Sequence, residues 1–456
     1  MVFSSLVFLF GFLPPCIMIG TLLHRRIDLQ NLFLLFVSLL FYAWGEPRRV
    51  LLFVITIFLN WSLVILSARA DSDTGRKTLG IAAITIDILI LFWFKYAGWL
   101  GRGIGLEIGS ATLPIGVSFY IFQAISYVAD ATLLGKYEAE KSPVNVGLYI
   151  AFFPQLIAGP IVRYEEMRDQ IRNRRMTLDR FEQGCFRFIF GFCKKVLLAD
   201  TVAVIANRAF SLGGDLTSSF AWIGAIAYTF QIFMDFSGYS DMAIGLGAMF
   251  GFKIPENFNC PYRASSIRDF WRRWHITLSV WFRDYVYIPL GGSRKGDRRT
   301  ILNVAVVWLL TGIWHGANWT FILWGVIYGA LVLTEKIIDI DRHIREWNSV
   351  KRVAYRMFSL LAIMLLWVLF RAENISSAAA YVGSMFKFGS EGISEAVLYI
   401  SEMKWSLIGC TVLSVVPYDK INRKRTVLWP MILILFLVSV SYLVKGTFSP
   451  FLYFNF

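Results

Sequence analysis

Long apolar segments separated by short charged segments dominate the chain. A membrane-spanning helix needs about 20 mostly apolar residues. Segments of this character lie at residues 3–22, 50–67, 79–94, 111–133, 186–206, 218–236, 358–370, 400–416 and 427–444. Together with a longer run at 301–334 and several shorter pieces, they predict about eleven transmembrane helices. The predicted fold class is therefore all-α: a polytopic helical membrane protein with additional re-entrant or interfacial helices.

Two apolar pieces are shorter than an ordinary span. Residues 31–44 and 147–162 are predicted to be re-entrant or enclosed by the bundle, where surrounding protein can satisfy irregular backbone. The segment 3–22 has no basic region before it and no small-residue cleavage site, so we expect a retained first span. Without an internal repeat or a soluble appendage, a single domain covering residues 1–456 is the simplest expectation.

The uncharged run from Ile301 to Thr334 holds one strongly polar ionisable side chain, His315. As one helix, its 34 residues would extend for about 50 Å, whereas the hydrocarbon core is about 30 Å thick. Gly312 and Gly316 flank the histidine, and glycine tolerates unusual dihedrals and close backbone approach. The pattern predicts a break that places His315 near a helix junction beside a cavity. The alternative is a packed histidine bonded to a neighbouring helix.

Composition excludes a soluble globular domain. Hydrophobic residues make up 57% of the chain and charged residues 17%, and the formal net charge is +14. The five cysteines form no CxxC pair and have no metal-ligand spacing with the four histidines. Neither a disulfide framework nor a metal site is predicted.

The basic residues are clustered. Residues 24–26, 163–180, 263–299 and 419–425 would face the cytoplasm under the positive-inside rule. Between residues 263 and 299 there are nine Lys or Arg and only three Asp. Topology and anionic lipid headgroups explain such a surplus. A docking face for an anionic cytosolic donor explains it equally well, and the two interpretations are compatible.

Apolar side chains at three- and four-residue spacing predict one amphipathic helix over residues 267–285. Its aromatic and basic faces suit the membrane interface. His275 falls outside the apolar face, which favours an exposed, hydrogen-bonded or structural histidine over a catalytic one.

A motif-bearing core at 113–340 contains the segments Leu113-Pro-Ile-Gly-Val-Ser-Phe-Tyr120, Phe152-Phe-Pro-Gln-Leu-Ile-Ala-Gly-Pro160, Met234-Asp-Phe-Ser-Gly-Tyr-Ser-Asp241, Arg268-Asp-Phe-Trp-Arg-Arg-Trp-His-Ile-Thr-Leu-Ser279, Trp281-Phe-Arg-Asp-Tyr285, Tyr287-Ile-Pro-Leu-Gly-Gly292 and Thr311-Gly-Ile-Trp-His-Gly-Ala-Asn-Trp319. These segments resemble motifs of the membrane-bound O-acyltransferase family, above all its alginate O-acetyltransferase branch. Before residue 110 and from about 340 to 445, the chain matches that family only in hydropathy.

The resemblance implies an acyltransferase with a tunnel through the membrane, with His315 as its catalytic histidine and His275 as the second. A neutral imidazole can act as general base on a hydroxyl that attacks a thioester. Further candidates for lining the tunnel or binding the donor, each with a packing, capping or structural alternative, are Asn318, Trp319, Arg272, Arg273, Asp235, Asp241 and Ser237. We expect Asp235 and Asp241 to act mainly as structural polar anchors.

The implied reaction needs no tightly bound cofactor. We expect acetyl-CoA as donor substrate, with a phosphopantetheine carrier as the alternative. The expected acceptor is an extracytoplasmic polysaccharide such as alginate, reached through a partner transferase or adaptor protein across a bacterial inner membrane. No nucleic-acid partner is expected. D-alanyl transfer to teichoic acid remains an alternative, and so does a non-enzymatic transporter, although the chain lacks the inverted repeat typical of one.

The C-terminal tail, residues 446–456, would lie outside the cell. Its sequence Pro450-Phe-Leu-Tyr-Phe-Asn-Phe456 resembles the terminal aromatic motif of alginate-type members. This resemblance suggests that Tyr453 enters the tunnel and carries the acyl group. The alternative is an aromatic anchor at the membrane interface.

Overall fold

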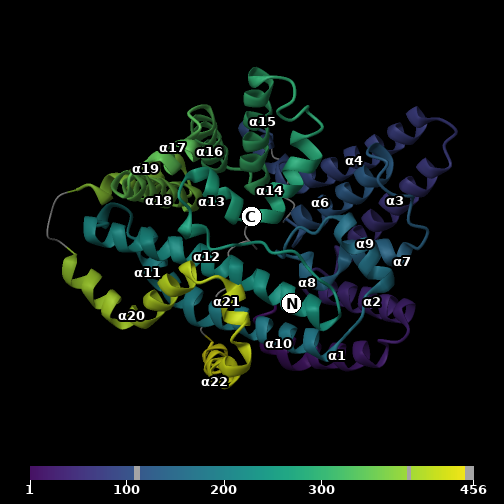
Figure 1. Ribbon diagram of the computed structural model, residues 1–456, viewed down its shortest axis with the longest axis horizontal. Helices are drawn as coiled ribbons and strands as arrows, with labels where there is room; N and C mark the ends of the chain where they lie inside the picture. Colours follow the sequence, from purple (N-terminus) through teal and green to yellow (C-terminus); the bar gives the residue numbers. More distant parts are fainter. Residues whose placement is uncertain (107–112, 388–391, 447–456) are drawn as a thin grey trace. The chain divides into compact units, whose positions relative to one another are not determined.

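The computed structural model describes residues 1–106, 113–387 and 392–446, and these are helices and connecting segments without a β-strand (Figure 1). The predicted all-α class is confirmed. The described residues divide into two compact units. Unit 1 comprises Met1–Phe190 and Tyr239–Glu256, and unit 2 comprises Gly191–Gly238 and the described part of Asn257–Leu452. That the whole chain forms one domain stays a prediction.

Unit 1 is built from helices of uneven length. A π-helical turn at Val7–Phe12 leads into α1, and α3 and α4 lie side by side (Figure 1). The helices are α1 (Leu13–Leu22), α2 (Ile27–Gly45), α3 (Val50–Ala68), α4 (Asp73–Lys95), α5 (Ala97–Gly103), α6 (Val117–Val128), α7 (Pro143–Ala151), α8 (Phe153–Leu156), α9 (Tyr164–Asn173) and most of α10 (Leu178–Cys193).

Unit 2 contains both predicted catalytic histidines. Its helices are α11 (Asp200–Ser211), the first part of α12 (Ser218–Met249), α13 (Ile267–Arg273), α14 (Ile276–Phe282), α15 (Asp297–His315), α16 (Trp319–Ile337), α17 (Ile340–Glu346), α18 (Ser349–Arg371), α19 (Ile375–Met385), α20 (Ile393–Val415), α21 (Tyr418–Asn422) and α22 (Arg425–Val444).

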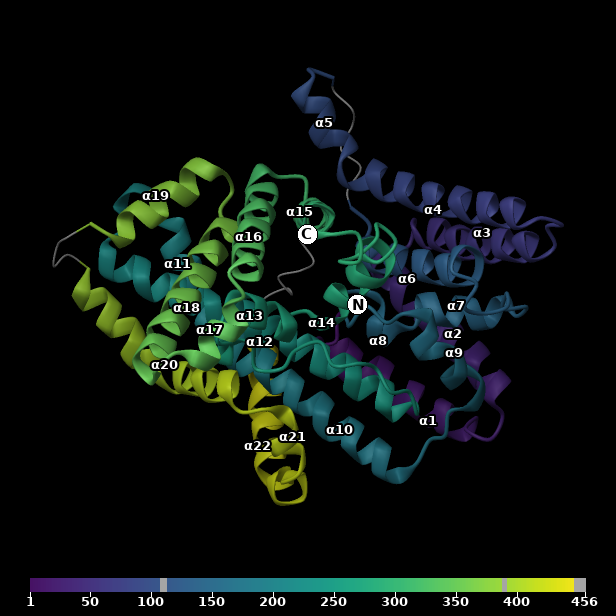
Figure 2. The ribbon, with the colours of Figure 1, turned by 45° about the horizontal axis from the view of Figure 1, so that its top comes forward.

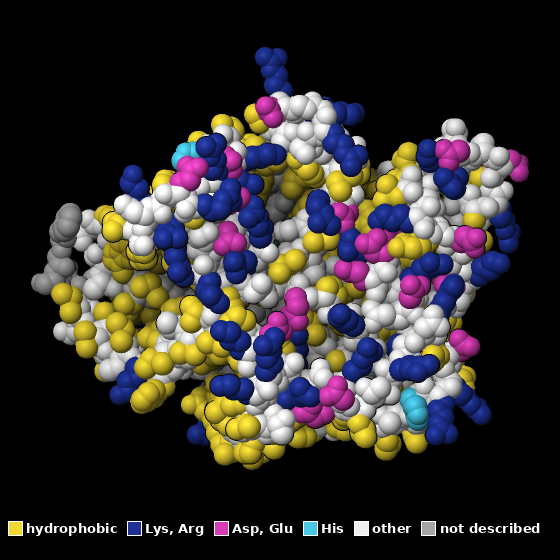
Figure 3. Space-filling model, in the orientation of Figure 1, with side chains coloured by type: hydrophobic (Ala, Val, Ile, Leu, Met, Phe, Trp, Pro, Cys, Tyr) yellow, Lys and Arg dark blue, Asp and Glu magenta, His cyan; other side chains and the backbone are white. Residues whose placement is uncertain are grey.

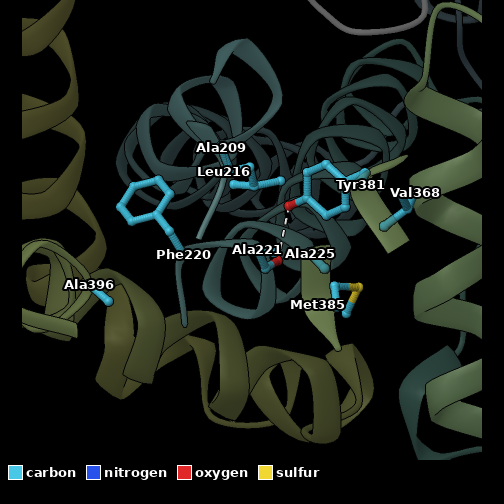
Figure 4. Packing of buried hydrophobic residues seen from close by; sticks show 9 residues of the cluster. All are labelled: Ala209, Leu216, Phe220, Ala221, Ala225, Val368, Tyr381, Met385 and Ala396. Carbon is cyan, nitrogen blue, oxygen red and sulfur yellow. Dashed lines mark hydrogen bonds between the residues drawn. The ribbon is translucent and has the colours of Figure 1, made fainter. Parts of the chain in front are cut away.

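A hydrophobic cluster joins α11, α12, α18, α19 and α20 of unit 2 (Figure 4). Phe220 is fully buried in it, and the Tyr381 hydroxyl donates a 2.9 Å hydrogen bond to the Ala221 carbonyl. The bond satisfies a hydroxyl that would otherwise be costly to bury. Tyr381 therefore contributes both apolar area and a fixed polar contact to this core.

Seven of the described helices are long and apolar enough to cross a membrane. They are α2, α3, α4, α16, α18, α20 and α22. Many of their large apolar side chains remain exposed, as expected for surfaces that face lipid. On the face drawn in Figure 3, exposed hydrophobic side chains gather in patches, and Lys and Arg are more widespread than Asp and Glu. A multi-pass protein is confirmed, but the count of eleven spans is not.

The segment at 31–44 is longer than the sequence suggested. It belongs to α2, whose 19 residues qualify as a candidate span, so the expectation that this segment is shorter than an ordinary span is wrong. The polar Asp28 and Gln30 at the start of the helix obscured its length, because a search for apolar residues excludes them.

The predicted break in the 301–334 run is confirmed. Helix α15 ends at His315 and α16 begins at Trp319, and the two helices lie side by side (Figure 2). The Asn318 side chain caps α16 by accepting a 3.1 Å hydrogen bond from the Thr320 amide. An ideal Cβ at Gly312 would lie only 2.5 Å from the Phe321 carbonyl oxygen. The absent side chain is what allows α15 and α16 to approach closely.

The single amphipathic helix predicted for 267–285 is wrong. The structure has two short helices, α13 and α14, with an interruption at Trp274 and His275. The aromatic positions fit a helical period on both sides of the interruption, so periodicity alone did not reveal it. His275 adopts a left-handed conformation, with φ of 46°.

We predict that Gly312→Ala lowers the melting temperature of the detergent-solubilised protein. The new methyl group would push on backbone, and overpacking of this kind costs about 1–3 kcal/mol. The control is Gly383→Ala in α19, where a Cβ meets nothing within 4 Å and alanine favours the helix. Equal melting temperatures for the two variants would refute the role assigned to Gly312.

Candidate active site

His315 is the last residue of α15 and is enclosed by aromatic rings. It is 4% exposed. The centroid of its ring lies 5.1 Å from that of Trp324 and 5.0 Å from that of Phe370, both in edge-to-face geometry. Trp324 belongs to α16 and Phe370 to α18, so three helices fix the imidazole. Such a setting restricts water around the ring and holds its orientation.

His275 lies between α13 and α14 and is 1% exposed, so the expectation of an exposed side chain is wrong. The expected hydrogen bond is present: Nδ1 lies 3.1 Å from Oδ1 of Asn257. A left-handed conformation costs a non-glycine residue about 1–2 kcal/mol. Burial lowers the pKa of His275 to about 3, because the charged imidazolium would lose its hydration. The ring is therefore neutral at physiological pH.

Trp314 connects the two histidines. Its ring centroid lies 6.0 Å from that of His275 and 4.9 Å from that of His315. Phe236 of α12 packs edge-on against the other side of His275 at 4.8 Å. The two imidazoles thus share one aromatic neighbour, although residues 40 positions apart supply them. The sequence motifs indicated both histidines as catalytic candidates, but they did not indicate the tryptophan that contacts both rings.

A cavity of about 440 Å³ opens beside His275. Its wall carries the polar side chains of Ser279 and Thr311 as well as apolar and aromatic residues of α13, α14, α15 and α16. His315 is not among the described residues that line it. Three arginines also line the cavity: Arg268, Arg272 and Arg283.

The arginines give the cavity wall a positive charge. Asp341 pairs with both Arg268 and Arg272, at 3.3 and 2.8 Å, and Asp284 pairs with Arg283 at 2.7 Å. Three cations against two carboxylates leave a surplus of one positive charge in these pairs. Arg272 is more than half exposed, so its electrostatic effect is modest and depends on salt. The arrangement suits an anionic group beside the arginines and an uncharged reacting group beside His275.

Glu335 fixes the start of α13, the helix that carries Arg268 and Arg272 of the cavity wall. Its buried carboxylate accepts hydrogen bonds from the backbone amides of Ile267 and Arg268, at 2.8 and 2.7 Å, and from the Tyr355 hydroxyl at 2.9 Å. An acidic group is favourable at a helix N-terminus. Sequence reasoning missed Glu335 because it lies just beyond the uncharged run; an acidic residue at the end of an apolar helix was the available signal.

Asn318 and Trp319, which were candidates for lining the tunnel or binding the donor, do not line the described cavity. The Asn318 side chain caps α16 and also donates to the Glu373 carbonyl at 2.8 Å. The capping alternative is therefore the one observed. Trp319 is 61% exposed and is not among the described residues that line the cavity. Arg273 pairs with Asp269 at 2.9 Å and is not part of the described cavity wall.

Asp235 and Asp241 both lie inside the long helix α12, not near the end of a span. Within unit 2, Lys195 contacts Asp235 at 2.9 Å and Asp200 at 2.6 Å. Within unit 1, Arg187 contacts Asp241 at 2.9 Å. These buried pairs agree with the expected role as structural anchors.

The remaining predicted positions do not enter the described cavity. The Ser237 hydroxyl donates to the Phe233 carbonyl one helical turn earlier, at 2.5 Å. Tyr453 lies outside the described residues, and its role as an acyl relay stays a prediction. Within the described part of the chain, no group of three or more His, Cys, Asp or Glu side chains is arranged to hold a metal ion.

Comparisons with known proteins identify the family to which the chain is similar. The model of the membrane-bound O-acyltransferase family matches residues 35–372. A probable alginate O-acetylase AlgI of Pseudomonas putida is 41% identical, over the full length of both chains. A peptidoglycan O-acetyltransferase of Helicobacter pylori is 32% identical over 92% of this chain and 87% of that protein. A teichoic acid D-alanyltransferase of Bacillus subtilis is 28% identical over 76% of this chain and 89% of that protein.

The matched region includes both histidines, the cavity and the helices that fix them. The predicted family resemblance is confirmed by the family model and by identity over the full length of a relative. The chain belongs to the membrane-bound O-acyltransferase family and is a multi-pass membrane O-acyltransferase.

Proposed function

We propose that the protein transfers acetyl from a cytosolic thioester donor, acetyl-CoA, for the O-acetylation of an extracytoplasmic polysaccharide such as alginate. The observation that carries the proposal is the cavity of unit 2, whose wall includes three arginines and the buried, neutral His275. The similarity to proteins named as O-acetylases favours acetyl over D-alanine as the transferred group.

The reaction needs a base and exclusion of water. In the proposed step, His315 removes the proton from the acceptor hydroxyl as its oxygen attacks the thioester carbonyl. The carbon–sulfur bond breaks, the thiolate leaves, and the proton passes from the imidazole to the sulfur. General base catalysis of this kind contributes about 10²–10⁴-fold. The aromatic rings around His315 support the proposal because they keep water from competing with the hydroxyl.

The donor would bind by its negative charges. Coenzyme A carries phosphates, which arginine binds well because its planar guanidinium offers several donors. Arg268, Arg272 and Arg283 are the side chains we assign to this contact. An acidic carrier protein with a phosphopantetheine arm would meet the same charges. The acceptor polysaccharide and a partner protein on the far side of the membrane belong to the same proposal.

We predict that His315→Gln lowers acetyl transfer from acetyl-CoA by about 10²–10⁴-fold, because glutamine fills similar space but cannot act as the base. Transfer is measured with radiolabelled donor and purified protein in nanodiscs. His343→Gln is the control, because His343 is an exposed histidine on α17. Transfer by His315→Gln within threefold of wild type would contradict the role of this residue.

We predict that Arg272→Gln raises the KM for acetyl-CoA by about 3–10-fold with little change in kcat, and that added salt reduces the difference. Arg342→Gln provides the control, since Arg342 is exposed on α17 and pairs with Glu346 away from the cavity. The assignment fails if both variants have the KM of wild type, or if only kcat changes.

A further inference from the structure

We infer that Asn257 is a positioning residue that holds His275 in the tautomer whose Nε2 is unprotonated and faces the cavity as a hydrogen-bond acceptor. The inference rests on the proposed function for its consequence in catalysis. Its structural part, the protonation state of one ring nitrogen, does not require that function.

The identity of the asparagine atom follows from its other partners. Oδ1 of Asn257 accepts hydrogen bonds from the Thr277 amide at 3.3 Å and from the Thr277 hydroxyl at 2.9 Å. A backbone N–H can only donate, so this atom is the carbonyl oxygen of the side chain and not its NH₂ group. Nδ1 of His275 lies 3.1 Å from the same oxygen. Nδ1 must therefore carry the proton, and in a neutral ring Nε2 is left without one.

The backbone of Asn257 holds the same turn. Its carbonyl accepts a 2.9 Å hydrogen bond from the Ile276 amide, and Asn259 N–H donates to the Arg273 carbonyl at 2.9 Å. The segment 257–259 thus brackets His275 on both sides and supports its left-handed conformation. Strain of this kind persists where surrounding contacts fix it, often at functional sites. Asn257 therefore determines both the direction of the ring and which nitrogen carries the proton.

The other ring nitrogen is available. Among the described residues, Nε2 of His275 has no hydrogen-bond partner, although it is buried, and His275 lines the cavity. A buried polar atom without a partner is unusual and indicates a missing ligand or water. The chemistry that fits Nε2 is an O–H or N–H donor on the bound molecule. In the proposed reaction these donors are the amides of the pantetheine arm and a hydroxyl of the acceptor other than the attacking one, whose proton passes to His315.

The charges around the ring favour the neutral state. Arg268, Arg272 and Arg283 line the same cavity, and two of these share Asp341. On α13, Asp269 is paired with Arg273, and on α12, Asp235 is paired with Lys195. The residues of α14 and the end of α15 that approach the ring carry no charge, apart from His315 itself. No acid on these elements is left to stabilise an imidazolium, in agreement with the low pKa caused by burial.

Imidazole ¹⁵N spectra test the tautomer directly. Wild-type protein labelled at its four histidines should show, between pH 5 and pH 8, one ring with a protonated Nδ1 and an unprotonated Nε2 that His275→Gln removes. Asn257→Ala should convert this signal to a mixture of tautomers. Thr277→Val, which deletes one neighbouring hydrogen bond and leaves the Asn257 to His275 contact, should leave the signal unchanged. A protonated Nε2 in wild type, or an unchanged spectrum in Asn257→Ala, overturns the inference.

The pH profile of acetyl transfer tests the consequence. Asn257→Asp keeps the acceptor but places a carboxylate beside Nδ1–H, which raises the pKa of His275. Protonation would turn Nε2 into a donor, so the acid limb of kcat/KM should move upward by about one pH unit or more. A higher KM for acetyl-CoA in this variant would assign the contact to an amide of the donor. A lower kcat would assign it to a hydroxyl of the acceptor. An unmoved acid limb in a folded variant overturns the role, whereas a wild type without any transfer refutes the proposed function and leaves the spectra decisive.

Discussion

The close approach of α15 to α16 is the constraint on which the candidate site depends. Gly312 has no side chain where the Phe321 carbonyl lies, and Gly325 has none where the Trp308 carbonyl lies. Glycine at both positions lets the two backbones pack at a distance that any Cβ would prevent. The contact places Trp324 against His315 and brings Val332 and Thr311 to the same cavity wall. Without it, the histidine at the end of α15 would lose its aromatic enclosure.

The short helices beside this pair need external support, because helices of seven residues are unstable alone. Glu335 supplies it for α13 by binding two amides at its start. Asn257 supplies it for α14: its side-chain oxygen accepts a hydrogen bond from the Thr277 amide, and its backbone carbonyl accepts one from the Ile276 amide. Both supports are polar groups buried in apolar surroundings, where an unsatisfied partner is costly. The same bonds that stabilise the two helices therefore also fix the arginines and His275 around the cavity.

Much of this arrangement was readable from sequence, for reasons that differ between residues. His315 was conspicuous because an ionisable group in an apolar run needs an explanation, and the break after it followed from helix length and two glycines. His275 was harder to interpret, because aromatic periodicity on either side of it suggested one continuous helix. The turn at His275 depends on Asn257, which lies 18 residues earlier and makes its contacts only in the folded chain. Asn318 was ambiguous for a similar reason: a capping side chain and one that lines the tunnel look alike until the hydrogen-bond partner is seen.

The central claim is that the cavity beside His275 binds the acyl donor with its reacting carbon at His275, on the side of the ring that Trp314 joins to His315. The most direct measurement is a cryo-EM reconstruction of the protein in nanodiscs with a non-hydrolysable analogue of acetyl-CoA. The account predicts density for the phosphates at Arg268, Arg272 and Arg283 and for the acetyl-bearing arm beside His275 and Trp314. Density for the analogue at another place, with this cavity empty, would contradict it.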